Sequence, residues 1–510
     1  MFRTILIANR GEIAIRIART CREMGIRAVG VYSAADRDAL HRRHMDASVE
    51  IGPSPARESY LHIDRVLAAA KATAAQAIHP GYGFLAENTE FTRRCAEEDL
   101  VFIGPGPEAM AKSGDKIGSR RAMADLDIPI TPGSGATRTE EEAAEAARDL
   151  TYPVILKASG GGGGIGMHVV HGPDELPSAF RLAQSAALAS FADPTIFVEA
   201  FHRRPRHIEV QVFLDRHGKA VHLGERECSI QRRHQKLLEE SPSPIVDPES
   251  RARIGAMAVR GTRAIGYVNA GTVEFLHADG RFYFNEINAR LQVEHTITEA
   301  VTGIDLVREQ IRVAAGEPLS VSQDEVTLTG SAIECRINAE DPTANFAPSP
   351  GIITAYHEPG GPGVRVDSGI AQGSVVQAFY DPLVAKVIAH GRTRSDAIAR
   401  MGRALPEFVI EGIATVIPLH RRILADDRFR AGELATSFLE DRGLLAAMAG
   451  ERDAEIAALA AALAARPSLA SHLRPAIPLR SPPASRWSAA GRPHPGGDHA
   501  AAHRARRTRP

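Results

Sequence analysis

The sequence predicts a multidomain chain of the α/β and α+β classes, and three observations support this prediction. Near the N-terminus, short apolar runs alternate with amphipathic helical stretches, which is typical of a parallel sheet with crossover helices. Around residues 271–295, an Asp-Gly pair separates two runs of alternating polarity, which indicates a β-hairpin. The length of 510 residues suggests two to four domains.

Residues 1–112 are expected to form the parallel α/β domain. A helix is predicted over Glu12–Met24. Its apolar side chains at Ile13, Ile17 and Cys21 share one face, and a glycine follows its end. Asn9-Arg-Gly-Glu stands where a dinucleotide-binding fold has Gly-x-Gly-x-x-Gly, which argues against such a site. The predicted strands cover Ile5–Ala8, Arg27–Tyr32, Ala77–His79 and Val101–Gly104.

A second domain is expected over residues 113–325, and its most unusual feature is a run of five glycines that follows Ser159. Such a run has a large ordering cost, which a mobile loop with bare amides that close over phosphate would justify. A plain linker is the alternative. We favour the lid because the run lies between two strand signals, at residues 154–157 and 167–170. Met167 after the last glycine of the loop excludes a Walker A loop.

The hairpin over residues 271–295 carries a candidate metal site. Side chains two apart on a strand share a face, so Glu286 and Asn288 point the same way and Glu274 on the partner strand can join them. Two carboxylates and an amide oxygen suit Mg²⁺ or Mn²⁺ rather than zinc. An ordinary solvated strand face is the alternative. Polar residues follow at the same period of two, which predicts a group for phosphate and a second small anion at Arg290, Gln292 and Glu294.

The remainder of the chain divides into three stretches. Residues 330–446 are predicted to be mostly β, with Gly/Pro turns, and residues 447–466 to form a short helix. From Arg466 onward the last 45 residues contain nine Arg, eight Pro and one acid, so we expect a disordered basic tail over 467–510. A tail of this kind could contact nucleic acid or an acidic partner, but a functionless extension is favoured.

Composition excludes several classes of protein. A net charge of −1 gives no bulk attraction to nucleic acid or to an anionic membrane, and no run of about 18 apolar residues is present. The four cysteines form no Cys-x-x-Cys pair, which argues against a zinc site or a disulfide scaffold. We therefore expect a cytoplasmic protein with no nucleic-acid or membrane partner.

Seven motifs, in unbroken order over residues 1–446, resemble biotin carboxylase, the ATP-grasp subunit of biotin-dependent acyl-CoA carboxylases of the acetyl-CoA carboxylase type. The resemblance implies an N-terminal biotin carboxylase domain, an ATP-grasp domain with a lid over about 130–203, and a C-terminal biotin carboxylase domain. It also implies ATP-dependent carboxylation of biotin by bicarbonate through a carboxyphosphate intermediate. The motifs are Ile7–Ile13, His79–Leu85, Gly114–Lys116, Lys157–Gly164, Gln231–Lys236, Asn288–His295 and Glu334–Asp341.

The resemblance assigns residues to each part of the reaction. For metal, it implies two Mg²⁺ or Mn²⁺ sites at Glu274, Glu286 and Asn288. For ATP, it implies Lys116, Lys157, Gly163, Gly164, Glu199, Ala200, Phe201, His202, His207, Gln231, His234 and Leu276. For bicarbonate and biotin, it implies Lys236, Arg290, Gln292, Val293, Glu294, Arg336 and Tyr82. Within that set the catalytic residues would be Lys236, Arg290, the general base Glu294, and Arg336, which stabilises the ureido oxygen of biotin.

The implied partners are a biotin carboxyl carrier protein and a carboxyltransferase subunit, because no Ala-Met-Lys-Met attachment motif is present. A homodimer is also implied, with Arg16 near its interface. One alternative is another ATP-grasp ligase that activates a different acid, against which the Lys236 and Arg290 pocket argues. A second is a non-catalytic ATP-binding scaffold, which Ala200 and Ile165 favour because the family has basic side chains there. The final carboxyl acceptor is a property of the transferase.

A chain that ends near Arg466 tests the interpretation of the tail. The composition of residues 467–510 is unsuited to burying a core, and no family motif lies within them. We expect the shortened protein to keep its Tm and its free-biotin-dependent ATPase activity, measured beside the full chain. A large fall in either quantity would show that the tail docks on the folded body.

Overall fold

The structure is a computed structural model that describes residues 1–160, 166–191 and 193–464. The chain divides into a unit of Met1–Arg452 and a unit that begins at Asp453, whose described part is the end of helix α15 (Leu444–Ala464). The expected glycine lid and the expected disordered tail therefore fall largely or wholly outside the described residues, and both stay predictions. None of the described helices is long and apolar enough to cross a membrane.

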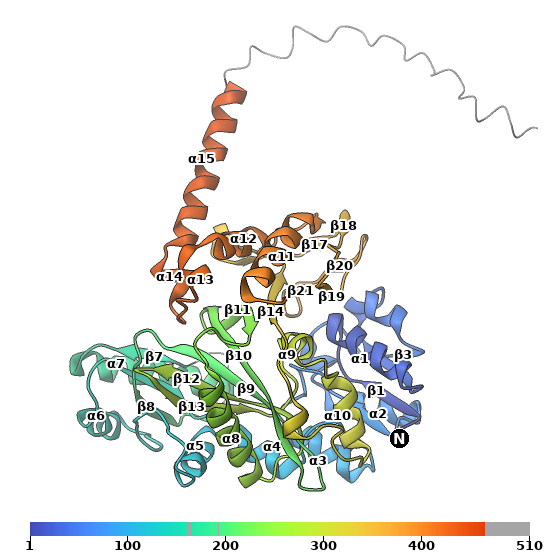
Figure 1. The fold of residues 1–510 in the computed structure, drawn as a ribbon, viewed down its shortest axis with the longest axis horizontal. Coiled ribbons are helices and arrows are strands. Elements are labelled where there is room, and N and C mark those ends of the chain that lie inside the picture. The colour runs from blue at the N-terminus through green and yellow to red at the C-terminus, as the bar shows by residue number, and fades with distance from the viewer. Residues whose placement is uncertain (161–165, 192, 465–510) are drawn as a thin grey trace, which may run out of the picture. The chain divides into compact units, whose positions relative to one another are not determined.

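The first sheet is parallel throughout and has the strand order β3-β2-β1-β4-β5 (Figure 1). The four predicted strands and the predicted helix are present, whereas β3 had not been predicted. Ile13, Ile17 and Cys21 of α1 are buried, as their spacing predicts. The elements are β1 (Thr4–Ile7), α1 (Gly11–Glu23), β2 (Arg27–Tyr32), β3 (Ala47–Glu50), α2 (Ile63–Ala72), β4 (Ala77–His79), α3 (Thr89–Glu97), β5 (Val101–Phe102) and α4 (Pro107–Gly114).

A small antiparallel sheet with the order β7-β6-β8 follows. Two helices pack on it and bury a compact apolar cluster that includes Val154, Phe180 and Val198. Its strands β6 and β7 lie on either side of the glycine run, as the strand signals predicted. The elements are α5 (Lys116–Ala124), α6 (Glu140–Arg148), β6 (Val154–Ala158), β7 (His168–Val170), α7 (Leu176–Phe191) and β8 (Ile196–Ala200).

The largest sheet is antiparallel, with the order β13-β12-β9-β10-β11-β14-β21-β19. It joins two regions that the sequence analysis treats separately, because β11 pairs with β14. Helix α9 packs on β10, β11, β14 and β21 and so lies over this junction. The elements are β9 (Arg206–Leu214), β10 (Ala220–Arg232), β11 (Gln235–Ser241), α8 (Pro248–Ala264), β12 (Asn269–Ala278), β13 (Arg281–Asn288), α9 (His295–Thr302), β14 (Ser331–Asn338), β19 (Val364–Ser368) and β21 (Leu383–Gly391).

The predicted hairpin is present in β12 and β13. Both residues of its Asp279-Gly280 turn have positive φ, which a two-residue hairpin turn requires. The prediction that residues 290–294 continue the same strand is wrong, because β13 ends at Asn288. Pairing between β12 and β13 stops at Thr272, and the chain then turns inward, buries Leu291 completely and enters α9.

The rest of the C-terminal region mixes helices with short strand pairs. Three two-stranded sheets form from β15 with β16, β17 with β20, and β18 with β22. The helices build a second core around Met401, Leu419 and Phe429. The elements are α10 (Leu306–Ala314), β15 (Glu340–Asp341), β16 (Ala347–Pro348), β17 (Gly351–Ile352), β18 (Ala355–His357), β20 (Val375–Val376), α11 (Arg394–Glu407), β22 (Val409–Glu411), α12 (Ile417–Ala425), α13 (Asp427–Ala431) and α14 (Phe438–Asp441).

Phe284 offers a direct test of how much the hairpin contributes to stability. Its ring is fully buried and lies edge-on to Phe275, with ring centroids 6.5 Å apart. Phe284→Ala should lower the free energy of unfolding by about 3–5 kcal/mol, because it opens a cavity that the sheet cannot close. The measurement is the urea unfolding midpoint. Leu182→Ala on the exposed face of α7 is the control, expected to change stability by no more than about 0.5 kcal/mol. Equal effects of the two would contradict this account.

Candidate active site

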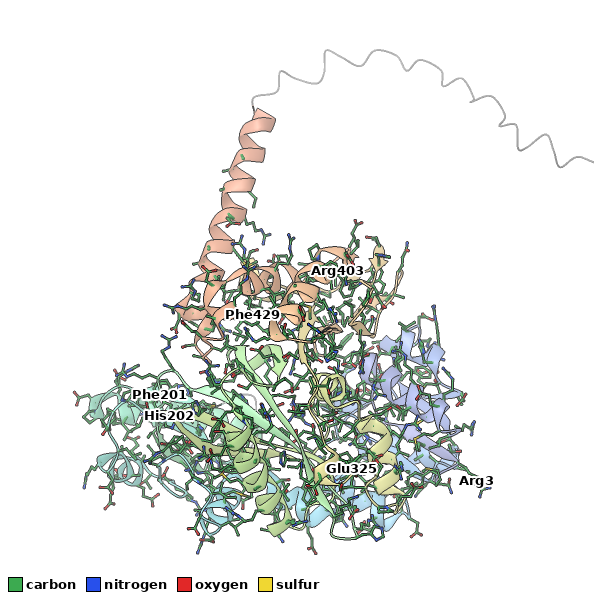
Figure 2. The ribbon with its side chains drawn as sticks, in the orientation of Figure 1. Arg3, Phe201, His202, Glu325, Arg403 and Phe429 are labelled. Atoms are coloured by element: carbon green, nitrogen blue, oxygen red, sulfur yellow. The ribbon has the colours of Figure 1, made fainter. Side chains whose placement is uncertain are left out.

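A cavity of about 390 Å³ lies between the small antiparallel sheet and the largest sheet. Its volume is in the range of small-molecule sites. Phe201 and His202 follow β8 at its wall (Figure 2), and the His202 ring stacks on Tyr283 with centroids 4.9 Å apart. Gly163 and Gly164 lie outside the described residues. The other residues expected to bind ATP all line this cavity: Lys116, Lys157, Glu199, Ala200, Phe201, His202, His207, Gln231, His234 and Leu276.

Three cations face this cavity, each beside a carboxylate. Lys157 Nζ lies 2.6 Å from Glu199 Oε2, and Lys116 Nζ lies 3.2 Å from Glu286 Oε2. Arg120, which sequence analysis missed, pairs with the same Glu199 and donates to the Thr131 carbonyl at 2.7 Å. Positive side chains in a cavity of this size are suited to a polyanion such as a nucleotide phosphate chain.

A row of charged side chains crosses the largest sheet at one level. Glu286 on β13 pairs with Glu274 on β12, which pairs with Glu209 on β9, which pairs with Arg226 on β10. Asn288 Nδ2 donates to Glu274 Oε1 at 2.9 Å. The pattern of two therefore brings the three predicted metal residues together, as the hairpin argument requires.

The donor set fits a hard cation at Glu274, Glu286 and Asn288. These residues offer carboxylate and amide oxygens, which Mg²⁺ and Mn²⁺ prefer. Two further groups of close ligand atoms share Glu209, one with His207 and Glu274, the other with Cys228 and Glu294. The Lys236 ammonium already lies among those carboxylates, so the open carboxylate for a metal is Glu286 at the cavity wall.

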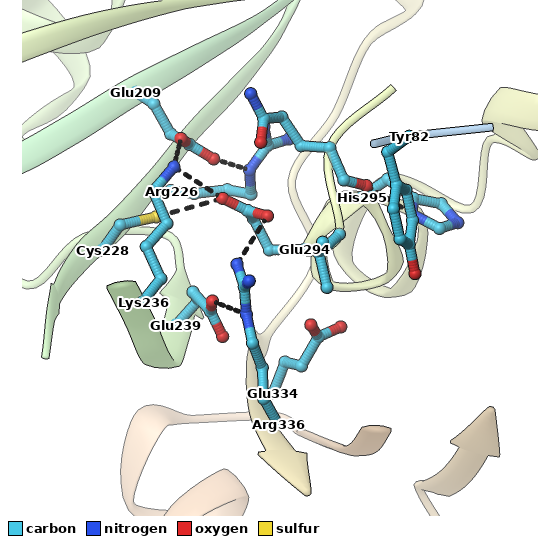
Figure 3. A network of polar contacts seen from close by, with 12 residues as sticks. Tyr82, Glu209, Arg226, Cys228, Lys236, Glu239, Glu294, His295, Glu334 and Arg336 are labelled. Atoms are coloured by element: carbon cyan, nitrogen blue, oxygen red, sulfur yellow. Dashed lines mark hydrogen bonds and ion pairs between the residues drawn. The ribbon is translucent and has the colours of Figure 1, made fainter. Parts of the chain in front are cut away.

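Glu294 is the centre of a network of polar contacts, drawn in Figure 3. Its carboxylate is fully buried, although it comes from the turn just before α9. Lys236 Nζ donates to Oε1 at 2.7 Å, and the Arg336 guanidinium donates to Oε2 at 3.0 Å. Lys236 also reaches Glu209 at 2.5 Å and Glu274 at 3.0 Å, and Arg336 reaches Glu239 at 2.6 Å. This network, the Glu294 cluster, joins the metal row to β14.

The electrostatics of the Glu294 cluster favour charged groups despite burial. Burial alone would raise the pKa of Glu294, but Lys236, Arg336 and Arg226 outweigh it and hold that pKa well below its usual value. The pKa of Lys236 is correspondingly raised well above its usual value by the surrounding carboxylates, against the effect of burial. Burial likewise opposes the charge on His207, but Glu274, 3.0 Å away, raises its pKa. Glu294 is thus a carboxylate, and a proton acceptor, at neutral pH.

A second cavity, of about 300 Å³, adjoins the Glu294 cluster. Tyr82, Arg290 and Val293 line it together with residues from the N-terminal sheet and from the start of β21. Arg290 Nε lies 2.9 Å from Glu87, and the Tyr82 hydroxyl donates to Glu12. Gln292 is not among the lining residues of either cavity and is buried beneath the turn that carries Glu294.

Sequence reasoning missed Glu209, Arg226 and Glu239, which complete the cluster. A signal for the first was present, since polar residues recur every second position on β9 at His207, Glu209 and Gln211, and all three are buried. Polar side chains with a period of two on a central strand predict a buried polar network. Glu239 has no comparable local signal, because its partner Arg336 lies 97 positions away.

Comparisons with known proteins agree along the chain. Residues 1–110 match the family described as biotin carboxylase, N-terminal domain, and residues 334–441 match biotin carboxylase C-terminal domain. Residues 115–322 match the ATP binding domain of carbamoyl-phosphate synthase L chain.

Individual relatives cover most of the chain. A subunit of the pyruvate carboxylase of Methanothermobacter thermautotrophicus is 52% identical over 451 residues, which are 88% of this chain and 92% of that protein. Biotin carboxylase 1 of Bacillus subtilis is 51% identical over 443 residues, 86% and 98% of the two chains. A crystal structure of the 2-oxoglutarate carboxylase biotin carboxylase domain dimer from Hydrogenobacter thermophilus, with MgADP, ADP and bicarbonate, has a TM-score of 0.85 and 43% identity, covering 87% of this chain and 98% of that one.

Glu286 tests the metal assignment with little risk to the fold, because its side chain is partly exposed and its ion pair is with Lys116. Glu286→Gln should weaken Mn²⁺ binding in the presence of ADP by about tenfold or more, since a charged oxygen ligand becomes a neutral one. Electron paramagnetic resonance of free Mn²⁺ gives the affinity. Glu440→Gln, at another wall of the same cavity, is the matched control. If both variants bind Mn²⁺ as the unaltered chain does, Glu286 is not a metal ligand.

Proposed function

The chain belongs to the biotin carboxylase family, and on that premise we propose how its residues carry out the ATP-dependent carboxylation of biotin by bicarbonate. The observation that carries the proposal is the buried Glu294 carboxylate, held by Lys236 and Arg336 between two cavities. One cavity suits a nucleotide, and the other has room for a small organic substrate. Such an arrangement brings a base and two anion-binding cations to the boundary of both.

In the first step, we assign Lys116 and Lys157 to the phosphates, where their charge offsets negative charge that develops on the transferring phosphoryl group. Mg²⁺ or Mn²⁺ at Glu274, Glu286 and Asn288 would supply further neutralisation by binding phosphate oxygens. Bicarbonate would be held by Lys236 and Arg290, whose planar guanidinium matches a planar anion. Glu294 takes the bicarbonate proton as the oxygen attacks the γ-phosphorus, which yields carboxyphosphate and ADP.

In the second step, the ureido nitrogen of biotin takes the carboxyl group and phosphate leaves. Arg336 would stabilise the negative ureido oxygen, since its guanidinium already lies 3.0 Å from Glu294 and so at the reacting end of the cluster. Tyr82 lines the second cavity, which makes that cavity our candidate for the biotin ring. Val293 lies in the same wall, between Arg290 and the base.

The proposed partners are a biotin carboxyl carrier protein, which presents the biotin, and a carboxyltransferase that receives it. The relatives named above belong to carboxylases with different acceptors, so the acceptor is left to the transferase. We also propose a homodimer, on the strength of the Hydrogenobacter domain dimer. Arg16, expected at the interface, instead bonds within the chain to Glu299 and Asp305, each at 2.7 Å. Four buried free cysteines support a reducing, cytoplasmic location.

Glu294→Gln tests the general base. The amide keeps the shape of the side chain and removes its ability to take a proton, so bicarbonate-dependent ATP cleavage with free biotin should fall by about 10²-fold or more. ATP affinity, measured by calorimetry, should stay within about twofold. Glu225→Gln is the matched control, because Glu225 is an equally buried carboxylate that pairs with Arg251 away from both cavities. Turnover near that of the unaltered protein in Glu294→Gln would remove Glu294 from the role of base.

A further inference from the structure

A fully buried lysine behind the Glu294 cluster has no role in the mechanism above. Lys386 lies on β21, inside the segment from Tyr380 onward, and its side chain has no exposed surface. An ammonium in a protein interior is costly unless it is paired and hydrogen-bonded. Its one hydrogen bond among the described residues is to the Val293 carbonyl, with Nζ and O 2.6 Å apart.

The neighbouring carboxylates account poorly for this ammonium. The nearest, Glu12, has its Oε1 3.8 Å from Nζ, too far for a hydrogen bond, and accepts one from Tyr82 instead. Asp367, directly across from Lys386 on β19, is bonded to Arg365 at 2.7 and 2.9 Å. Glu334 on β14 accepts from Thr296. Each carboxylate therefore has another partner, and the closest contact of Lys386 is the backbone of the turn that carries the base.

That turn lacks support from secondary structure. Residues 289–294 belong to neither strand nor helix, so their carbonyls are fixed by side chains. His295 contacts the Gln292 carbonyl through its backbone N at 3.3 Å and its Nδ1 at 2.8 Å. Lys386 fixes the next carbonyl, at Val293. The two contacts together set the direction in which the chain leaves the turn at Glu294.

The register of β21 explains why a lysine can do this. Lys386 pairs directly with Arg336 on β14, so the two cations share a face and reach the same carboxylate from different sides. Arg336 bonds the Glu294 side chain, whereas Lys386 bonds the carbonyl of the residue before it. We propose that Lys386 is a positioning residue for the reaction: its ammonium holds the Val293 carbonyl and thereby places the Glu294 carboxylate against Lys236 and Arg336. This inference rests on the proposed function.

Lys386→Met, which keeps the length and apolar character of the side chain, is the first variant. We expect kcat to fall and the KM for bicarbonate to rise, by about tenfold or more in kcat/KM, because a small displacement of the base is costly. The KM for ATP should change by less than about twofold, since no described residue of the nucleotide cavity bonds to Lys386. A purely structural defect would change the two KM values together. Arg251→Met, which deprives the buried Glu225 of its cation elsewhere in the fold, is the control and should leave both KM values unchanged.

The double variant Glu12→Gln/Lys386→Met separates positioning from charge balance, with Glu12→Gln alone as its reference. Removing both charges should restore Tm toward that of the unaltered chain while leaving the high bicarbonate KM. Recovery of that KM would overturn the proposal, because Lys386 would then only neutralise Glu12.

Hydrogen exchange gives a readout that is independent of catalysis. In Lys386→Met and in the double variant, the amides of residues 290–296 should exchange faster, with the N-terminal sheet unchanged. Unchanged exchange in that turn would also overturn the proposal. If the unaltered protein itself lacks bicarbonate-dependent ATP cleavage, the proposed function fails, and the exchange result still decides whether Lys386 holds the turn.

Discussion

The site depends on a buried carboxylate that two cations keep charged. Glu294 has no exposed surface, and burial opposes its ionisation, yet Lys236 and Arg336 at 2.7 and 3.0 Å more than compensate. Removing one partner from such a group leaves an uncompensated charge, which is far more costly than the net value of the pair. The surrounding sheet has to hold Lys236, on β11, and Arg336, on β14, at fixed positions. The direct pairing of β11 with β14 does this, and it is the reason that the middle and C-terminal regions share one sheet.

This sharing also explains the position of the two cavities. The metal row crosses β13, β12, β9 and β10, and the Arg336–Lys386 pair crosses β14 and β21, so one antiparallel sheet carries both halves of the chemistry. The nucleotide cavity opens toward β6 and β8 on one side, and the second cavity opens toward the N-terminal sheet on the other. A reactive intermediate made in the first needs to travel only across the Glu294 cluster. Short transfer distances and exclusion of water protect such an intermediate from hydrolysis.

The sequence predicts the local parts of this arrangement better than the long-range ones. The hairpin turn at Asp279-Gly280, the pairing of Glu274 with Glu286 and the buried face of α1 all follow from spacing within a few residues. The strand expected past Asn288 is wrong, because alternating letters continue after the hydrogen-bonded partner has ended. The pairing of β11 with β14 joins segments about a hundred positions apart, and no periodicity encodes which strands become neighbours. For the same reason Glu239 and Lys386 could not be identified from their own surroundings, whereas the β9 alternation would have revealed Glu209. The roles of the site residues still rest on the family resemblance and on geometry.

The low pKa of Glu294 has to be reconciled with its role as a base, since a carboxylate that holds its proton weakly is a poor acceptor. The depression comes from Lys236, Arg336 and Arg226, once burial has been outweighed. A bound bicarbonate would take contacts from Lys236, and a negative ureido oxygen would take contacts from Arg336. Each such contact reduces the share of positive charge that Glu294 feels, while burial remains and continues to raise its pKa. The same desolvation that the two cations overcome in the free protein therefore becomes a source of basicity once substrate anions compete for them. On this argument the base strengthens as its substrate binds, and the buried setting of Glu294 serves catalysis as well as structure.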